Sequence, residues 1–162
     1  MNDLRDLYVE QLRDIYDAEK QLIDALPKMA EAATSTRLQQ TFNNHLDQTT
    51  HHIQRLEEIF TRMDLDPTGK TCEGMKGLIK EGEQVIKKRS DSDVKDAALI
   101  AAAQHVEHYE IASYGTICTY AEQLNETETL NTLRKTLAEE KNTDQTLSQL
   151  AEERINLRAQ SS

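Results

Sequence analysis

The sequence has 162 residues, the length of one domain of ordinary size with room for a substantial hydrophobic core. Acidic residues outnumber basic ones by 29 to 19, and the formal net charge of −10 disfavours nucleic acids and anionic membranes as partners. Hydrophobic residues make up 37% of the chain and charged residues 30%, while only five glycines and two prolines interrupt it. This composition favours long helices with a well-solvated surface.

The cellular location follows from features that the chain lacks. Cys72 and Cys118 do not have the spacing of a zinc site or a disulfide framework, and we interpret both as reduced thiols. The N-terminus is charged throughout and has no apolar core of the kind found in secretory signals. No apolar run approaches the roughly 18–20 residues of a membrane span. We therefore expect a cytoplasmic protein without a membrane partner.

The first predicted helix covers about residues 3–33 and contains Pro27, which should kink or break it just before that residue. Ser35 or Thr34 can cap a second helix over about 36–63, because both side chains accept hydrogen bonds from unpaired backbone N–H groups. The short connection between the two helices predicts an antiparallel hairpin.

A turn over 64–71 leads to a shorter helix over about 72–89, which three glycines weaken and which we expect to pack across the bundle. The segment 90–93 then offers a cap for a long helix over about 94–124. The last predicted helix covers about 127–157 and should form a second hairpin with the one before it.

This order of elements predicts an all-α fold, namely a ferritin-like four-helix bundle with one long crossover. The connection between the second and third long helices has about 30 residues, enough to cross the length of a bundle, and it carries the additional short helix. We expect residues 1–157 to form a single domain and residues 158–162 to form a short, frayed tail.

Acidic residues interrupt apolar seams at the middle of three helices. Positions that recur in steps of three and four share one helix face and should point toward the core. The seam of the helix over 94–124 is Ile100, Ala103, Glu107, Glu110, Tyr114, Ile117, Ala121 and Leu124. That of the helix over 127–157 is Leu130, Leu133, Leu137, Glu140, Asp144, Leu147 and Ala151. That of the first helix is Tyr8, Leu12, Ile15, Glu19, Leu22 and Leu26.

Together these acids predict a metal site, because an unpaired carboxylate in a core is costly and the seams contain no Lys or Arg beside them. Dinuclear sites in helix bundles take one Glu from each of two helices and a Glu-x-x-His from each of the other two, a mixture that suits two Fe or Mn ions. Thr143 stands where the histidine of the last helix would be, and Asp144 can replace it as an oxygen ligand. The predicted ligands of these three helices are Glu19, Glu107, Glu110, Glu140 and Asp144.

The second helix leaves its ligand open. One possible inward column is Phe42, Leu46, Thr49, Ile53, Leu56 and Phe60, and the other is Phe42, His45, Thr49, His52, Leu56 and Ile59. Neither column supplies an acid at mid-helix, so His52 is the preferred ligand. His51, which pairs with Gln48 at i,i+3, is the second choice, and Asp47 and Gln48 lie just off the columns.

Three further residues near the seams need a structural interpretation. His105 and His108 flank the seam of the helix over 94–124 and are expected to face outward. Tyr114 lies one turn beyond Glu110 and is expected in the core, with a hydrogen bond to a metal ligand as the alternative.

Several stretches of the sequence closely resemble the YciE/YciF family of bacterial stress-associated proteins. The stretches that carry the resemblance are YDAEKQL (16–22), CEGMKGLI (72–79), DAALIAAAQHVEHYEIASYGT (96–116), YAEQL (120–124) and TLAEEKNTDQTLSQLA (136–151). The resemblance extends over nearly the whole chain. It implies a ferritin-like fold, a homodimer, a di-iron or related metal site, and a link to general, osmotic or oxidative stress.

The pair Glu107-x-x-Glu110 is also similar to the paired acids of rubrerythrins, which reduce peroxide at a di-iron centre, and Glu19 and Glu140 match the single acids of that pattern. The chain departs from the YciE/YciF relatives at Asp47-Gln48, where those relatives often carry a Glu-Glu pair. It also lacks the Glu-x-x-His of rubrerythrin helices and their four-cysteine iron module, so a reductant would have to come from elsewhere.

Three functions fit these observations. The first is a dinuclear Fe or Mn protein that acts on peroxide or dioxygen. The second is a non-catalytic structural or interaction dimer of the stress response with a degenerate metal site, in which protonation or hydrogen bonds hold the acids. The third is iron storage, which needs a closed shell of subunits that nothing in the sequence indicates.

Overall fold

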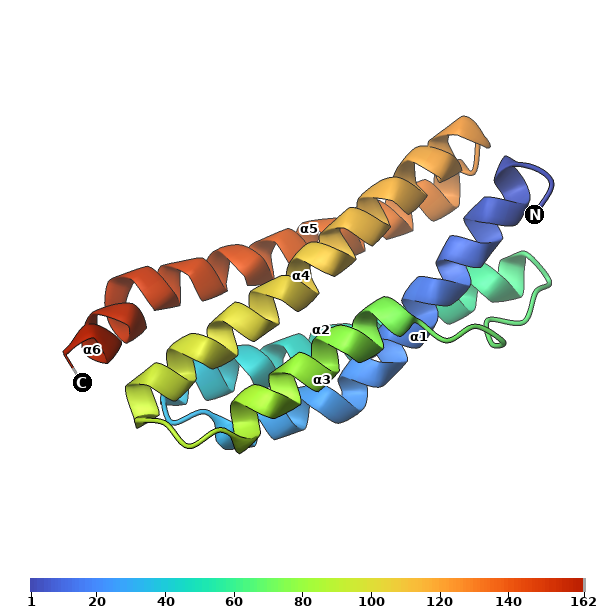
Figure 1. The fold of residues 1–162 in the computed structure, drawn as a ribbon. Helices are drawn as coiled ribbons and strands as arrows, with labels where there is room; N and C mark the ends of the chain where they lie inside the picture. Colours follow the sequence, from blue (N-terminus) through green and yellow to red (C-terminus); the bar gives the residue numbers. More distant parts are fainter. Residues whose placement is uncertain (162) are drawn as a thin grey trace.

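The computed structural model describes residues 1–161, and these residues form helices joined by short loops (Figure 1). In chain order the helices are α1 (Leu4–Ala32), α2 (Thr36–Arg62), α3 (Glu73–Lys87), α4 (Ser92–Gln123), α5 (Thr127–Leu150), a π-helical turn (Ala151–Ile155) and α6 (Asn156–Gln160). None of the helices in this part of the chain combines the length and the apolar character that a membrane-spanning helix needs.

The four long helices form the predicted bundle. α1 and α2 make one antiparallel hairpin and α4 and α5 make the other, while α3 runs back along the molecule between them and packs against α1 and α4 (Figure 1). α2 and α4 consequently run in the same direction, which requires a crossover along the length of the bundle. The all-α fold with one long crossover is confirmed, and α3 lies outside the four-helix core.

α1 does not break at Pro27, although the sequence favoured a kink or break there. Proline lacks a backbone N–H, so the helix loses one hydrogen bond at this position. The residues around it compensate for this loss, because Leu26 and Met29 are buried in the core and hold both sides of the turn against the bundle. Packing thus outweighs the local preference of proline.

The last predicted helix also differs from the expectation. α5 ends at Leu150, the chain widens into a π-helical turn, and α6 continues to Gln160 instead of fraying from position 158. Ala151 and Ile155 on this turn are both buried and pack near α4, so the widened turn keeps the chain in contact with the bundle. Position 162 lies outside the described residues.

The seams predicted for α1 and α4 face the core, with Leu124 only half-buried at the end of α4. In α5 the inward positions differ, because Thr136 and Thr143 are buried while Leu137 and Asp144 are only partly so. A seam in steps of three and four can take either of two adjacent residues at each turn, and a small rotation of the helix decides between them.

A buried acid joins the two hairpins at the end of the bundle where α1 meets α2. Asp96 of α4 is 1% exposed and accepts hydrogen bonds from the backbone N–H of Thr34 (2.8 Å), the Thr34 hydroxyl (2.8 Å) and the backbone N–H of Ser35 (2.7 Å). These donors satisfy the carboxylate without a second charge. Asp96 therefore fixes the α1–α2 loop against the start of α4.

The start of α3 is held against α1 and α4 by a second cluster of polar contacts. The Tyr109 hydroxyl donates to Oδ2 of Asp14 at 2.9 Å and lies 3.0 Å from Sγ of Cys72, which is 3.1 Å from the same carboxylate oxygen. Gly74 lets the tyrosine ring approach the α3 backbone, because a Cβ atom at position 74 would lie 2.7 Å from Cε2 of Tyr109. The turn before α3 needs glycine for another reason, since Gly69 has a φ of +101°.

We predict opposite effects for alanine at two glycines of α3. Gly74→Ala should lower the free energy of unfolding by about 1–3 kcal/mol, because the new methyl group displaces the Tyr109 ring. Gly77 has nothing within 4 Å of its added Cβ. Gly77→Ala should therefore raise stability by about 0.5–1 kcal/mol through helix propensity. Urea denaturation of both variants measures the difference, and equal stability of the two would contradict the close approach of Tyr109.

Candidate metal centre

Four glutamates from three helices meet at the middle of the bundle. Glu19 comes from α1, Glu107 and Glu110 from α4, and Glu140 from α5, and the side chain of each is 0% exposed. These are four of the five acids that the interrupted seams singled out. Their burial without any Lys or Arg in the same seams leaves a strongly negative centre, which needs positive charge close to it.

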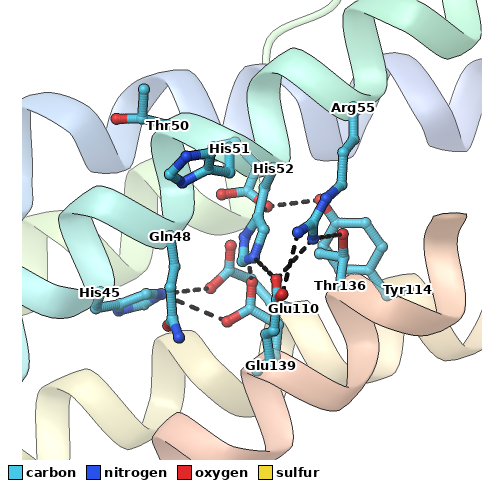
Figure 2. A network of polar contacts seen from close by, with 12 residues as sticks. His45, Gln48, Thr50, His51, His52, Arg55, Glu110, Tyr114, Thr136 and Glu139 are labelled. Atoms are coloured by element: carbon cyan, nitrogen blue, oxygen red, sulfur yellow. Dashed lines mark hydrogen bonds and ion pairs between the residues drawn. The ribbon is translucent and has the colours of Figure 1, made fainter.

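α2 contributes two histidines to this centre. His45 and His52 are seven residues apart, two helical turns, so both rings project from the same face, and both are buried at 2% and 0% exposure. Of the two columns that the sequence allowed, the one through these histidines is buried throughout. Figure 2 shows both rings pointing toward the carboxylates, whereas His51 points away from them.

His45 faces three of the acids. Its Nδ1 lies 2.9 Å from Oε1 of Glu107, and its Nε2 lies 3.4 Å from Oε2 of Glu140 and 3.8 Å from Oε2 of Glu110. Both ring nitrogens therefore point into the acidic centre. His45, Glu107, Glu110 and Glu140 each offer one donor atom, and these four atoms all lie within 4.8 Å of one another.

His52 faces the other side of the centre. Its Nδ1 lies 2.9 Å from Oε1 of Glu140 and 3.2 Å from Oε1 of Glu19, and these three residues form a second set of donors within 4.8 Å. Tyr114 is buried in the core, as expected, and its hydroxyl also donates to Oε1 of Glu19, one of the predicted ligands, at 2.6 Å. This hydrogen bond fixes the orientation of the Glu19 carboxylate.

The two donor sets share Glu140, and their size suits metal ions. Metal–ligand distances of roughly 2.1 Å place ligands on opposite sides of an ion about 4.2 Å apart, which is inside the spread of donors found here. A carboxylate that belongs to both sets faces both groups of donors. The arrangement could therefore hold metal, and Glu140 lies at its centre.

Most polar atoms of the centre lack hydrogen-bond partners among the described residues. The following buried atoms have no hydrogen-bond partner of acceptable geometry among residues 1–161: Oε2 of Glu19, both carboxylate oxygens of Glu107, Glu110 and Glu140, Nε2 of His45, Nδ1 of His52 and Oγ1 of Thr49. The short separations to histidine nitrogens given above do not meet the directional requirement. Buried carboxylates without hydrogen bonds are rare in folded proteins, so these orphaned atoms favour a bound cation.

Protons stabilise this cluster in the absence of metal. Burial, together with the other acids, raises the pKa of Glu110 well above its ordinary value, and burial raises the pKa of Glu107 to about 8. Burial alone would lower the pKa of His52, but the nearby carboxylates of Glu140 and Glu19 raise it to about 10. Burial would raise the pKa of Glu140, yet the two histidine rings beside its carboxylate lower it.

Some predicted residues lie outside the centre. Asp144 belongs to neither donor set and instead binds His108 (Oδ1 to Nε2, 3.3 Å) and Gln104 (3.2 Å) at the edge of the bundle. Thr143 is the buried residue at this turn instead, and its hydroxyl donates to Gln48. His105 and His108 are exposed, as expected.

His45 was missed as a candidate ligand, although its column had been considered. The signal was its spacing from His52, since two histidines seven residues apart on one apolar face can both reach a shared site. Asp47 and Gln48 do not belong to either donor set, and the ring of the exposed His51 is bonded to the backbone carbonyl of Asp47.

Comparison with known proteins finds relatives that span the chain. The sequence signature of the family described as Domain of unknown function (DUF892) matches residues 3–160. Protein YciF of Escherichia coli (strain K12) is 44% identical over 161 residues, which cover 99% of this chain and 97% of YciF. The crystal structure of the E. coli stress protein YciF matches with a TM-score of 0.93 over 96% of this chain and 99% of that chain.

Two other solved structures extend the comparison. YcfI from Rhodopseudomonas palustris is 42% identical and matches with a TM-score of 0.89 over 91% of this chain and 94% of that chain. A structure of ferritin-like, diiron-carboxylate proteins from Bacillus anthracis strain Ames matches with a TM-score of 0.72 over 93% of this chain and 99% of that chain, at 19% identity. At that identity the likeness shows the ferritin-like fold alone.

The pKa shifts predict that the metal-free protein loses stability as pH rises from about 6.5 to about 8. In this window folded Glu107 and His52 still hold protons that the unfolded chain has released, since their ordinary values are 4.5 and 6.5. Each extra proton in the folded state lowers the free energy of unfolding by about 1.4 kcal/mol per pH unit. The lowered pKa of Glu140 contributes a constant amount here, because its carboxylate is already ionised in both states.

The measurement is the urea midpoint of EDTA-treated protein across this range. Glu107→Gln should give a shallower decline, because its amide does not titrate. A midpoint of the unsubstituted protein that stays level or rises from pH 6.5 to 8 would contradict the shifts.

Proposed function

This chain belongs to the family described as Domain of unknown function (DUF892), and from this membership and the buried donor set we propose that it is a dinuclear metal protein. Two Fe or Mn ions would lie between the four long helices, and the loaded protein would act on peroxide or dioxygen. The observation that carries the proposal is the group of four buried carboxylates and two imidazoles, in which seven of the eight carboxylate oxygens lack a hydrogen-bond partner and Glu140 is shared between the two donor sets.

The charges of this donor set support two divalent ions. Four carboxylates carry four negative charges and two divalent cations carry four positive ones, so the occupied centre would be neutral with both histidines uncharged. Carboxylate and imidazole are ligands that both Fe and Mn accept, so the donor set does not choose between the two metals. Binding would release the protons that hold the cluster in the metal-free state.

The protein's own residues would set the conditions for the chemistry. When bound, two such ions supply electron exchange with peroxide or dioxygen. Burial of every donor residue excludes bulk water from the centre, which strengthens all of its electrostatic interactions. The hydrogen bond from Tyr114 holds one oxygen of Glu19, and Glu140 is placed to bridge the two halves.

Two of the relatives support the proposal. The B. anthracis neighbour is described as diiron-carboxylate and shares the fold. YciF is described as a stress protein, and we propose a role in the bacterial stress response for this chain as well. Three expectations stay predictions: a cytoplasmic location, a homodimer, and no nucleic-acid partner. The proposed redox activity would also need a separate reductant.

We predict that protein produced with ample Fe and Mn contains close to two ions per chain, and that Glu140→Gln binds metal at least about 100-fold more weakly. The reason is that the substitution removes a ligand of both ions, whereas loss of an outer partner alone typically costs 10–100-fold. Elemental analysis and titration against a chelator measure content and affinity. The matched control is Asp144→Asn, which alters a neighbouring acid outside both donor sets and should bind normally.

The same samples test the activity. The loaded protein should consume hydrogen peroxide with a chemical reductant, and the Glu140→Gln variant should not. If the unsubstituted protein retains no metal and EDTA does not change its midpoint temperature of thermal unfolding, the dinuclear proposal fails. The structural, non-catalytic alternative is then favoured.

A further inference from the structure

Glu139 lies beside the candidate centre and is occupied on both of its oxygens. Oε2 accepts hydrogen bonds from Nη1 of Arg55 (2.6 Å) and interacts with Nε2 of His52 (2.9 Å), and Oε1 accepts one from Nη2 of Arg55 (3.0 Å) (Figure 2). Arg55 also donates to the Thr136 hydroxyl at 3.0 Å. This network joins α2 to α5 at the side of the bundle, with the Arg55 and Glu139 side chains 18% and 26% exposed.

We propose that Glu139, clamped by Arg55, is a positioning residue that sets the orientation of His52 toward a metal ion. The inference rests on the proposed function. The Nε2 nitrogen of His52 faces Glu139 while Nδ1 faces Glu19 and Glu140, so the two ring nitrogens have separate tasks.

The chemistry of imidazole explains why this matters. A neutral imidazole carries one N–H and one lone pair, and a carboxylate acceptor at Nε2 requires the hydrogen there. The lone pair is then on Nδ1, the nitrogen that points into the donor set of Glu19 and Glu140. An outer carboxylate of this kind also makes the histidine a stronger ligand.

Arg55 gives Glu139 its fixed position and confines it to this task. The two-pronged contact between a guanidinium and a carboxylate fixes the plane of both groups, and it adds geometric specificity to the interaction. Because its two oxygens already have partners, Glu139 is not a ligand in either donor set, although it is adjacent in sequence to Glu140.

His45 has no equivalent partner among the described residues, since its two nitrogens face Glu107, Glu110 and Glu140. The two metal positions are therefore unequal. The orientation of His52 depends on Glu139 and Arg55, whereas the orientation of His45 depends only on the carboxylates of its own donor set. Loss of the Glu139–Arg55 contact should weaken the binding of the ion at His52 and leave the binding of the other ion unchanged.

Titration with Co²⁺ tests this, because its visible absorption reports each binding step. The protein should bind two ions, and Glu139→Gln should bind one with unchanged affinity and the other about 10–100-fold more weakly, with an altered absorption band for that step. Glu139→Asp keeps the negative charge and should restore part of the affinity. Arg55→Gln leaves the carboxylate but removes the clamp, and it should show the same loss for one ion to a smaller extent.

A matched control exists on the same pair of helices. Arg62 of α2 and Glu128 of α5 form an exposed ion pair at 2.6 Å that touches neither histidine. Glu128→Gln should bind both ions like the unsubstituted protein. Circular dichroism of the metal-free variants checks that each is folded before titration.

The outcomes separate the two proposals. Two normal affinities in both Glu139→Gln and Arg55→Gln, or equal weakening of both ions, would overturn the positioning role and leave the dinuclear centre standing. Failure of the unsubstituted protein to bind Co²⁺, Mn²⁺ or Fe²⁺ would overturn the centre, and the inference with it. Selective weakening of the binding of one ion supports the role of Glu139 in positioning His52.

Discussion

The burial of four carboxylates around two imidazoles is the constraint on which the rest of the molecule depends. Like charges in a low-dielectric core repel one another strongly, so this group is stable only with protons or cations among its members. The histidines of α2 can meet this need when they are protonated, because His45 lies within 4 Å of Glu107, Glu110 and Glu140 and His52 lies within 4 Å of Glu19 and Glu140. The same geometry leaves buried carboxylate oxygens without hydrogen-bond partners, and these oxygens are the ones that the proposed function assigns to metal.

The crossover topology places the donors where they can meet. Because α3 returns the chain along the bundle, α2 and α4 run parallel (Figure 1). His45 of α2 thereby lies 2.9 Å from Glu107 and 3.8 Å from Glu110 of α4. α3 itself provides no donor to either set, and its contribution is positional. The contacts among Cys72, Asp14 and Tyr109 attach its first turn to α1 and α4, on the outer side of the helices that carry Glu19 and Glu110.

Hydrophobic periodicity predicted the helices, the bundle and four of the carboxylates, because burial of one helix face leaves a regular trace in sequence. A small rotation of a helix about its axis changes this periodic pattern very little, so the sequence does not predict which of two adjacent residues faces inward. Thr143 rather than Asp144 faces inward for this reason, and the choice between two columns of α2 concealed His45. The continuity of α1 through Pro27 and the widened turn at Ala151 depend on packing against residues far away in the sequence, so no local pattern predicts them. The partnership of Glu139 with Arg55 is of the same kind, since the two residues are 84 positions apart.

The contacts of Asp96 have a consequence for how the centre is assembled. Its three donors are two backbone amides and a hydroxyl of the α1–α2 loop, so this link between the hairpins involves no metal and no titrating base. It sets the alignment of α4 against the first hairpin independently of what occupies the middle of the bundle. The cost of gathering the acids thus falls on folding, and the donor atoms are preorganised before any ligand arrives, which under the proposed function would favour tight binding of metal with little rearrangement.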